Sequence, residues 1–311
     1  MSLSALTRNV RIEDVLSVFV AVVLLTYIVS VGAWGSFHAG GDTWTVSFIA
    51  LPMSIIIFLA SLRYALGAEA TTIGRWVTEV TSIARDWLPF MLFLLFYGTF
   101  YSALWAKVHP RTFDATLLSA DRALFGETPS VAMQSWISGG LTSFMSLCYF
   151  LHLVFPPVMA FLWYRRDVRI FRQFLLAILF CGAIGTIGYL LIPAVGPGVA
   201  YPQLYSKTLS GSLYQPIIDF MDRARAPRDA FPSLHVGISA IVLIFAARYK
   251  NRIVLWILAP LIIGNWISTV YLRYHYVVDC VAGMIAAVLS VLLAIAALRW
   301  EARYQRAASL L

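Results

Sequence analysis

The sequence predicts an all-α integral membrane protein, organised as a polytopic helix bundle of about eight transmembrane helices. Of its 311 residues, 60% are hydrophobic and only 12% are charged, and the mean hydropathy is +0.80. These values lie far outside the balance of a soluble domain. The apolar residues also gather in eight runs, most of which approach the roughly 20 residues that cross a hydrocarbon core about 30 Å thick.

The first apolar run, residues 14–34, follows two arginines and could be taken for a signal peptide. It is longer than the apolar segment of a signal peptide and lacks a small-x-small cleavage site, so we expect a retained helix. The other predicted helices span 44–62, 87–106, 143–164, 173–193, 233–247, 253–270 and 276–298. The first two helices form an N-terminal unit, 1–86, and the other six form a core, 87–311.

The basic residues indicate how the chain is oriented. The net charge is +8, but the Lys and Arg residues lie mainly in short turns such as YRRDVRIFR and RYKNR. By the positive-inside rule, this distribution places both termini in the cytoplasm. We therefore expect a protein of the cell membrane or inner membrane, surrounded by membrane lipids, with no nucleic-acid partner.

Two long segments, 107–142 and 194–232, are then expected on the outer side. In the first, PSVAMQSWI (129–137) is typical of a short interfacial helix capped by Ser130, with Trp136 at head-group depth. In the second, PAVGPGVAYPQLY is rich in proline, glycine and tyrosine, which favours a structured loop over a cavity.

Polar residues concentrate where the second segment enters a helix, at AFPSLHVG (230–237). Ser233 and His235 lie in the expected first turn, where free backbone N–H groups and the helix dipole favour an anion. This stretch predicts a phosphate seat.

A second polar cluster, TVYLRYHYVVDCVAG (269–283), opens the last helix. His275 and Asp279 are four residues apart and share a helix face. The carboxylate can therefore accept a hydrogen bond from one imidazole nitrogen, which leaves the other nitrogen free to act as a nucleophile. Only one helix separates the two clusters, so both begin on the outer face and His235 and His275 can converge there.

The two clusters resemble the second and third signatures of the type 2 phosphatidic acid phosphatase (PAP2) superfamily, a Pro-Ser-x-His box and an Arg-x5-His-x3-Asp box. AFPSLHVG and STVYLRYHYVVD are most similar to the branch with fungal inositol phosphorylceramide synthase and its bacterial relatives. The resemblance covers roughly 190–285 and implies a six-helix catalytic core. It implies that His275 forms a phosphohistidine, Asp279 orients it, His235 protonates the leaving oxygen and Ser233 helps to hold phosphate oxygens.

The chain departs from the family pattern at its cations. The first signature, Lys-x6-Arg-Pro, is absent, and Thr269 stands where the third box has its arginine. Positive charge for the phosphate oxygens must come from elsewhere. The candidates are Arg273, Arg228, Arg225, Arg223 and Lys207. The alternatives are that Arg273 binds lipid head-groups and that 223–228 is a solvated loop.

The expected function is metal-independent transfer of a phosphate-bearing head-group between lipids, from a lipid phosphate ester to a lipid alcohol. Hydrolysis of a lipid phosphate, with water as acceptor, is the first alternative. A non-catalytic lipid transporter or proton-sensing protein is the second, because the first signature and the arginine of the third are missing. No CxxC spacing or compact carboxylate cluster occurs, so we expect no metal ion and no cofactor. His152, inside an apolar run, could line the lipid path or bond to another helix.

Overall fold

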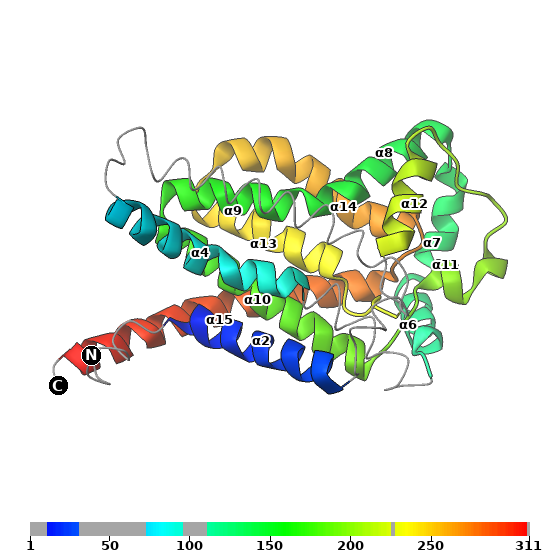
Figure 1. Cartoon of the computed structure of the whole chain (residues 1–311). Helices are drawn as coiled ribbons and strands as arrows, with labels where there is room; N and C mark the ends of the chain where they lie inside the picture. Colours follow the sequence, from blue (N-terminus) through cyan, green and yellow to red (C-terminus); the bar gives the residue numbers. More distant parts are fainter. Residues whose placement is uncertain (1–10, 31–72, 96–110, 225–227, 310–311) are drawn as a thin grey trace.

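The computed structural model describes residues 11–30, 73–95, 111–224 and 228–309. These ranges are helical and contain no strand; a single β-bridge joins Ala194 to Asp229. Figure 1 shows the long helices lying side by side, roughly along one axis. They are α2 (Ile12–Ser30), α4 (Ile73–Leu95), α8 (Gly139–Phe150), α9 (Phe155–Arg166), α10 (Val168–Leu191), α13 (Leu234–Arg248), α14 (Ala259–Tyr271) and α15 (Val277–Ser309).

Short helices gather at one end of this bundle, where Figure 1 places α6, α7, α11 and α12 around the starts of α13 and α15. We call it the site end. The short elements are α6 (Asp114–Phe125), α7 (Pro129–Ala132), α11 (Pro197–Ala200), α12 (Tyr214–Ala224) and the 3-10 turns η2 (Met133–Trp136) and η4 (Pro202–Leu204). The two long segments expected on the outer side are therefore largely folded.

Two of the described helices, α10 and α15, are long and apolar enough to cross a membrane. Helices α8 and α9 make a third span if they are counted together, with a bend of 46° at the 3-10 turn η3 (Leu151–Leu153). Helix α13 and the stretch Leu255–Tyr271 are shorter apolar helices. Eight spans remain a prediction, since 44–62 and part of 87–106 lie outside the described residues.

Several predicted boundaries differ from the structure. Helix α4 begins at Ile73, well before 87, and α15 continues beyond 298. Helix α6 was not predicted, because its mixed polar sequence resembles a loop. The residue before α7 is Thr128, not Ser130, and the Ser130 hydroxyl is instead bonded to the Tyr205 hydroxyl at 2.7 Å.

The middle of the bundle is an apolar core around α10. Phe171 of α10 packs against Trp87 of α4 with ring centroids 5.1 Å apart, and Phe174 packs against Phe245 of α13 at 5.2 Å. Such aromatic pairs contribute roughly 0.5–1.5 kcal/mol each beyond the burial of their area. The second pair joins α10 to α13, the helix that carries His235.

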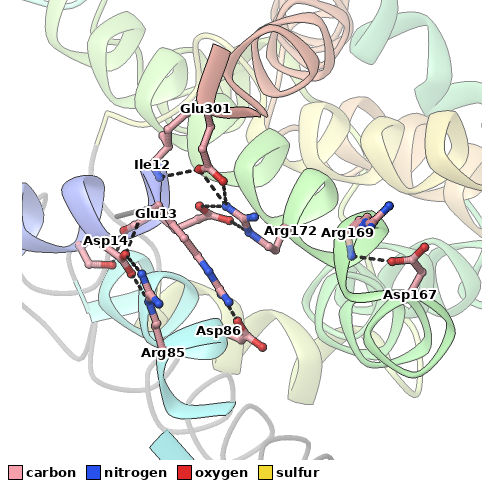
Figure 2. Close-up of polar contacts among 11 residues, drawn as sticks. Ile12, Glu13, Asp14, Arg85, Asp86, Asp167, Arg169, Arg172 and Glu301 are labelled. Atoms are coloured by element: carbon pink, nitrogen blue, oxygen red, sulfur yellow. Dashed lines mark hydrogen bonds and ion pairs between the residues drawn. The ribbon is translucent and has the colours of Figure 1, made fainter. Parts of the chain in front are cut away.

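Charged side chains join helices at the end opposite the site end (Figure 2). Arg172 of α10 donates to both carboxylate oxygens of Glu13 in α2, at 2.5 and 2.7 Å. It also donates to both oxygens of Glu301 in α15, at 2.8 and 2.9 Å. Glu13 and Glu301 are only 3% and 6% exposed, so each needs this partner to offset its desolvation.

Two further ion pairs join α2 and the segment before it to α4. Arg85 pairs with Asp14, and Arg11 pairs with Asp86. Together with Arg172 they tie α2 to α4, α10 and α15.

Candidate active site

The first turns of α13 and α15 meet because their backbones are bonded directly. Ser233 caps α13: its hydroxyl accepts the backbone N–H of Val236 at 3.4 Å, and its own N–H donates to the carbonyl of Asp279 at 3.0 Å. A Cβ atom at Gly283 would lie 2.3 Å from the carbonyl oxygen of Ser233. Glycine is therefore required at 283 for the two helices to approach this closely.

His235 and His275 face each other across this junction. Nδ1 of His235 lies 3.1 Å from Nε2 of His275. Nδ1 of His275 lies 2.8 Å from the carbonyl oxygen of Ala230, which can act only as an acceptor. Neutral His275 therefore carries its proton on Nδ1, and its Nε2 is unprotonated. This Nε2 accepts a hydrogen bond from Nδ1 of His235.

Asp279 is the buried carboxylate beside His275. Its Oδ2 lies 3.4 Å from Nδ1 of His275 and accepts the backbone N–H of Tyr276 at 2.9 Å. The residue is fully buried, and its Oδ1 has no hydrogen-bond partner among the residues that the structure describes. A positive charge that develops on the His275 ring would lie next to a desolvated carboxylate, where Coulomb stabilisation is strong.

Helix α6 caps the start of α15 with Asp121. The two carboxylate oxygens of Asp121 accept the backbone N–H groups of Val277 and Val278, both at 3.0 Å. Burial raises the pKa of Asp121, although these two bonds act in the opposite direction. Because Val277 is two residues after His275, this cap fixes the loop that carries the histidine.

Asp114, at the start of α6, holds a second part of the same loop. It accepts the Tyr276 hydroxyl at 3.0 Å and the backbone N–H groups of Val195 and Gly196 at 3.1 and 3.0 Å. Asp114 is buried, and each of these donors needs an acceptor there. One carboxylate thus connects α6, the loop before α11 and the residue next to His275.

Aromatic rings support His235 from the side of α8. Tyr149 stacks on His235 with centroids 4.7 Å apart and on Tyr274 at 4.8 Å. The His152 ring lies 4.1 Å from that of His235, and its Nδ1 donates to the Tyr149 carbonyl at 2.6 Å. His152 thus meets another helix through its ring, while its Nδ1 is bonded within its own turn.

The other residues predicted to bind phosphate lie in two regions: the histidine junction with the chain just before it, and a separate pocket. Ser233 is at the histidine junction, fully buried, with its hydroxyl serving as a helix cap. Arg228 lies nearby in the chain, half-buried and with a left-handed backbone, φ 71°. Arg225 lies outside the described residues, and Arg223 is described only through its backbone.

Arg273 and Lys207 are brought together at a separate pocket. Nη2 of Arg273 donates to the carbonyl of Lys207 at 2.5 Å, and its guanidinium lies 4.0 Å from the ring centroid of Tyr205. Among the described residues, both cations line the pocket and neither His235 nor His275 does. That these two cations hold the oxygens of the reacting phosphate therefore stays a prediction.

The sequence interpretation missed the residues that position the site: Asp114, Asp121, Tyr149 and Tyr276. A signal was present for the two aspartates, which are seven residues apart in DATLLSADRALF and so share one helix face. Tyr149 has no such signal, because its stacking partner His235 is distant in the sequence.

The chain matches the profile of the PAP2 superfamily over residues 115–293. It is also similar to phosphoinositol dihydroceramide synthase from Bacteroides thetaiotaomicron, with 24% identity over 238 residues that cover 65% of this chain and 73% of the relative. No solved structure shows a significant match. The matched region runs from α6 into α15 and includes His235, His275 and Asp279.

Proposed function

Because the chain belongs to the PAP2 superfamily and is a membrane lipid phosphatase or phosphotransferase, we propose that it moves a phosphate-bearing head-group between lipids through a phosphohistidine on His275. The observation that carries this proposal is the contact of His235 with His275. His275 presents an unprotonated Nε2, and His235 presents an N–H group. Similarity to a synthase supports transfer over hydrolysis.

In the first step, Nε2 of His275 attacks the phosphorus of a donor lipid phosphodiester. An N–P bond forms, and the bond from phosphorus to the lipid oxygen breaks. His235, protonated on both ring nitrogens at this stage, gives its Nδ1 proton to that oxygen and becomes neutral, so the first product is a lipid alcohol. The head-group phosphate remains on His275, next to the carboxylate of Asp279.

In the second step, the hydroxyl group of another lipid gives its proton to His235 and attacks phosphorus. A new P–O bond forms, the N–P bond breaks, and both histidines return to their starting state. Water in place of the lipid alcohol would complete a hydrolysis instead. The acceptor that reaches His275 therefore decides whether the enzyme is a transferase or a phosphatase.

For the membrane orientation, we propose that both termini are cytoplasmic and that the site end faces the outer side. The basic turns after α9 and α13 support this orientation, because Figure 1 places them at the end opposite the site end.

Product identification by mass spectrometry tests the function. Detergent-purified wild type and His275→Ala are given phospholipids together with lipid alcohols. We expect wild type alone to form a new lipid that carries the head-group of the donor, and to form an acid-labile phosphoenzyme. Release of phosphate or of a free phosphorylated head-group, without a new lipid, would show a hydrolase. Turnover by His275→Ala would remove His275 as the nucleophile.

A further inference from the structure

The bend between α8 and α9 lies beside His235. Helix α8 ends at Phe150 and α9 begins at Phe155, with the 3-10 turn η3 and a bend of 46° between them. The end of a helix leaves its last carbonyl groups without intrahelical partners, which is costly where water is excluded. A bend inside the bundle therefore needs side chains that replace the lost backbone bonds.

The side chains of His152 and Asn265 supply these bonds. Nδ1 of His152 donates to the carbonyl of Tyr149 at 2.6 Å. The amide of Asn265, in α14, donates to the carbonyls of Cys148 and Tyr149 at 3.2 and 3.4 Å. Asn265 is fully buried, so its bonds are made in a region of low dielectric constant. The last turn of α8 is thus held from its own chain and from a neighbouring helix.

The polar contacts continue from Asn265 into α13. The Ser239 hydroxyl lies 3.4 Å from Oδ1 of Asn265 and accepts the indole N–H of Trp266 at 2.8 Å. The same hydroxyl lies 2.6 Å from the carbonyl oxygen of His235, to which it can donate. Buried polar contacts therefore join α8, α13 and α14 at the level of His235.

The ring of Tyr149 contacts both elements that carry the histidine pair. It stacks on His235 with an interplanar angle of 23°, and on Tyr274, the residue before His275, with an angle of 8°. The His152 ring meets His235 at 63°, with centroids 4.1 Å apart. Two rings from the α8–α9 bend thus restrict rotation of the His235 side chain, and one of them also contacts the loop of His275.

The stacked ring also suits the charge that His235 carries in the proposed mechanism. The face of an aromatic ring is negative and attracts a cation that lies within about 6 Å of its centroid. The His235 ring lies 4.7 Å from the Tyr149 centroid and nearly parallel to it, so it is over this face. Tyr149 therefore favours the protonated form of His235.

We propose that Tyr149 is a positioning residue for proton transfer by His235. The inference rests on the proposed function, because it requires that His235 protonates the leaving oxygen. The Tyr149 ring keeps Nδ1 of His235 directed toward His275 and stabilises the charged imidazole. His152 and Asn265 hold Tyr149 in place through its carbonyl.

The test compares kcat for two donors: a lipid phosphodiester, whose lipid oxygen needs a proton, and a p-nitrophenyl phosphodiester, whose leaving group does not. Tyr149→Leu should lower the ratio of lipid to p-nitrophenyl kcat by about tenfold or more, because a misplaced acid slows only the first reaction. Tyr149→Phe keeps the ring and should restore most of the ratio. Phe150→Leu removes the neighbouring ring, which packs on Phe220 instead, and should leave the ratio unchanged.

Nitrogen NMR of the histidine rings separates this inference from the proposed function. The chain has five histidines, and the signals of His235 are those that His235→Ala lacks. At a pH where His235 is neutral, we expect its proton on Nδ1 in wild type and Tyr149→Phe. Tyr149→Leu should show a mixture of both tautomers, since the bond that sets the tautomer is no longer held.

If wild type transfers no head-group, the proposed function fails and the NMR spectra alone decide the inference. A wild-type His235 without its proton on Nδ1, or the same His235 tautomer in wild type and Tyr149→Leu, would overturn it. If transfer is observed, a kcat ratio that Tyr149→Leu leaves unchanged would overturn it while the proposed function stands.

Discussion

Nδ1 of His235 lies 3.1 Å from Nε2 of His275, so the proposed proton donor and the proposed nucleophile are in contact before substrate arrives. A phosphate group that reaches Nε2 must replace this bond, and its oxygens then lie beside the proton of His235. In the proposed mechanism the two histidines therefore have separable roles, one toward phosphorus and one toward the leaving oxygen.

The role of His235 predicts a dependence on the leaving group. His235→Ala should lower kcat by about 10²–10⁴-fold when a lipid alcohol leaves, because this oxygen needs a proton. The loss should be much smaller for a p-nitrophenyl phosphodiester, whose leaving group departs without one. His275→Ala should be inactive toward both substrates in the same rate assay. If His235→Ala loses the same factor with both leaving groups, His235 is not the acid.

Asp121 is expected to stabilise the start of α15. Asp121→Asn keeps one acceptor oxygen and leaves one of the two backbone N–H groups without a partner. The free energy of unfolding should fall by about 1.5–3 kcal/mol, as for hydrogen bonds to a charged group. Thermal unfolding in detergent measures this, with the exposed Asp219→Asn as the matched control. Equal melting temperatures for the two variants would show that α6 does not anchor the loop of His275.

The buried ion network predicts a large effect far from the site. Arg172→Gln leaves Glu13 and Glu301 buried without their cation, and should cost about 3–5 kcal/mol of stability. Arg169→Gln, on the same helix but exposed, should change stability little. Unfolding of both variants and turnover per folded molecule are the measurements. We expect the folded fraction of Arg172→Gln to retain turnover, and a selective loss of kcat would indicate coupling between the two ends of the bundle.

Chelation is expected to leave activity unchanged. Within the described ranges, no three His, Cys, Asp or Glu side chains are grouped so that they could hold a metal ion. In the proposed mechanism, charge on the reacting phosphate is stabilised by side chains and backbone donors. Transfer rates should be equal in EDTA and in EDTA presaturated with Mg²⁺. A rate that falls in EDTA and returns when Mg²⁺ is added would contradict this mechanism.

The convergence of His235 and His275 could be predicted, because it depends only on the number of helices between two polar helix starts. The catalytic roles given to these residues stay predictions. Helix α6 could not be predicted as a separate element, since its short sequence lacks the length and apolar content that identify a span. The break at His152 was hidden inside a continuous apolar run, because hydropathy records composition and not the path of the backbone.

The placement of Arg273 also lay beyond the sequence. In a continuous helix Arg273 would lie on the face of Thr269, four residues earlier, but its backbone is left-handed, φ 67°, and its side chain lies on Tyr205. A single residue with a left-handed backbone points its side chain away from the face that helical spacing predicts. The periodicity of the sequence does not reveal such a residue.

Helix α15 carries Asp279 in its first turn and Glu301 toward its other end. At 1.5 Å per residue these carboxylates are about 33 Å apart, close to the thickness of a hydrocarbon core. Helix α15 therefore separates the histidine pair from the Arg172 network by about one membrane thickness. With the network at one interface, the proposed nucleophile His275 would lie near the other interface and would reach phosphates of that leaflet alone. A donor or acceptor lipid made in the other leaflet must cross the bilayer first, so lipid translocation can limit the flux through this enzyme.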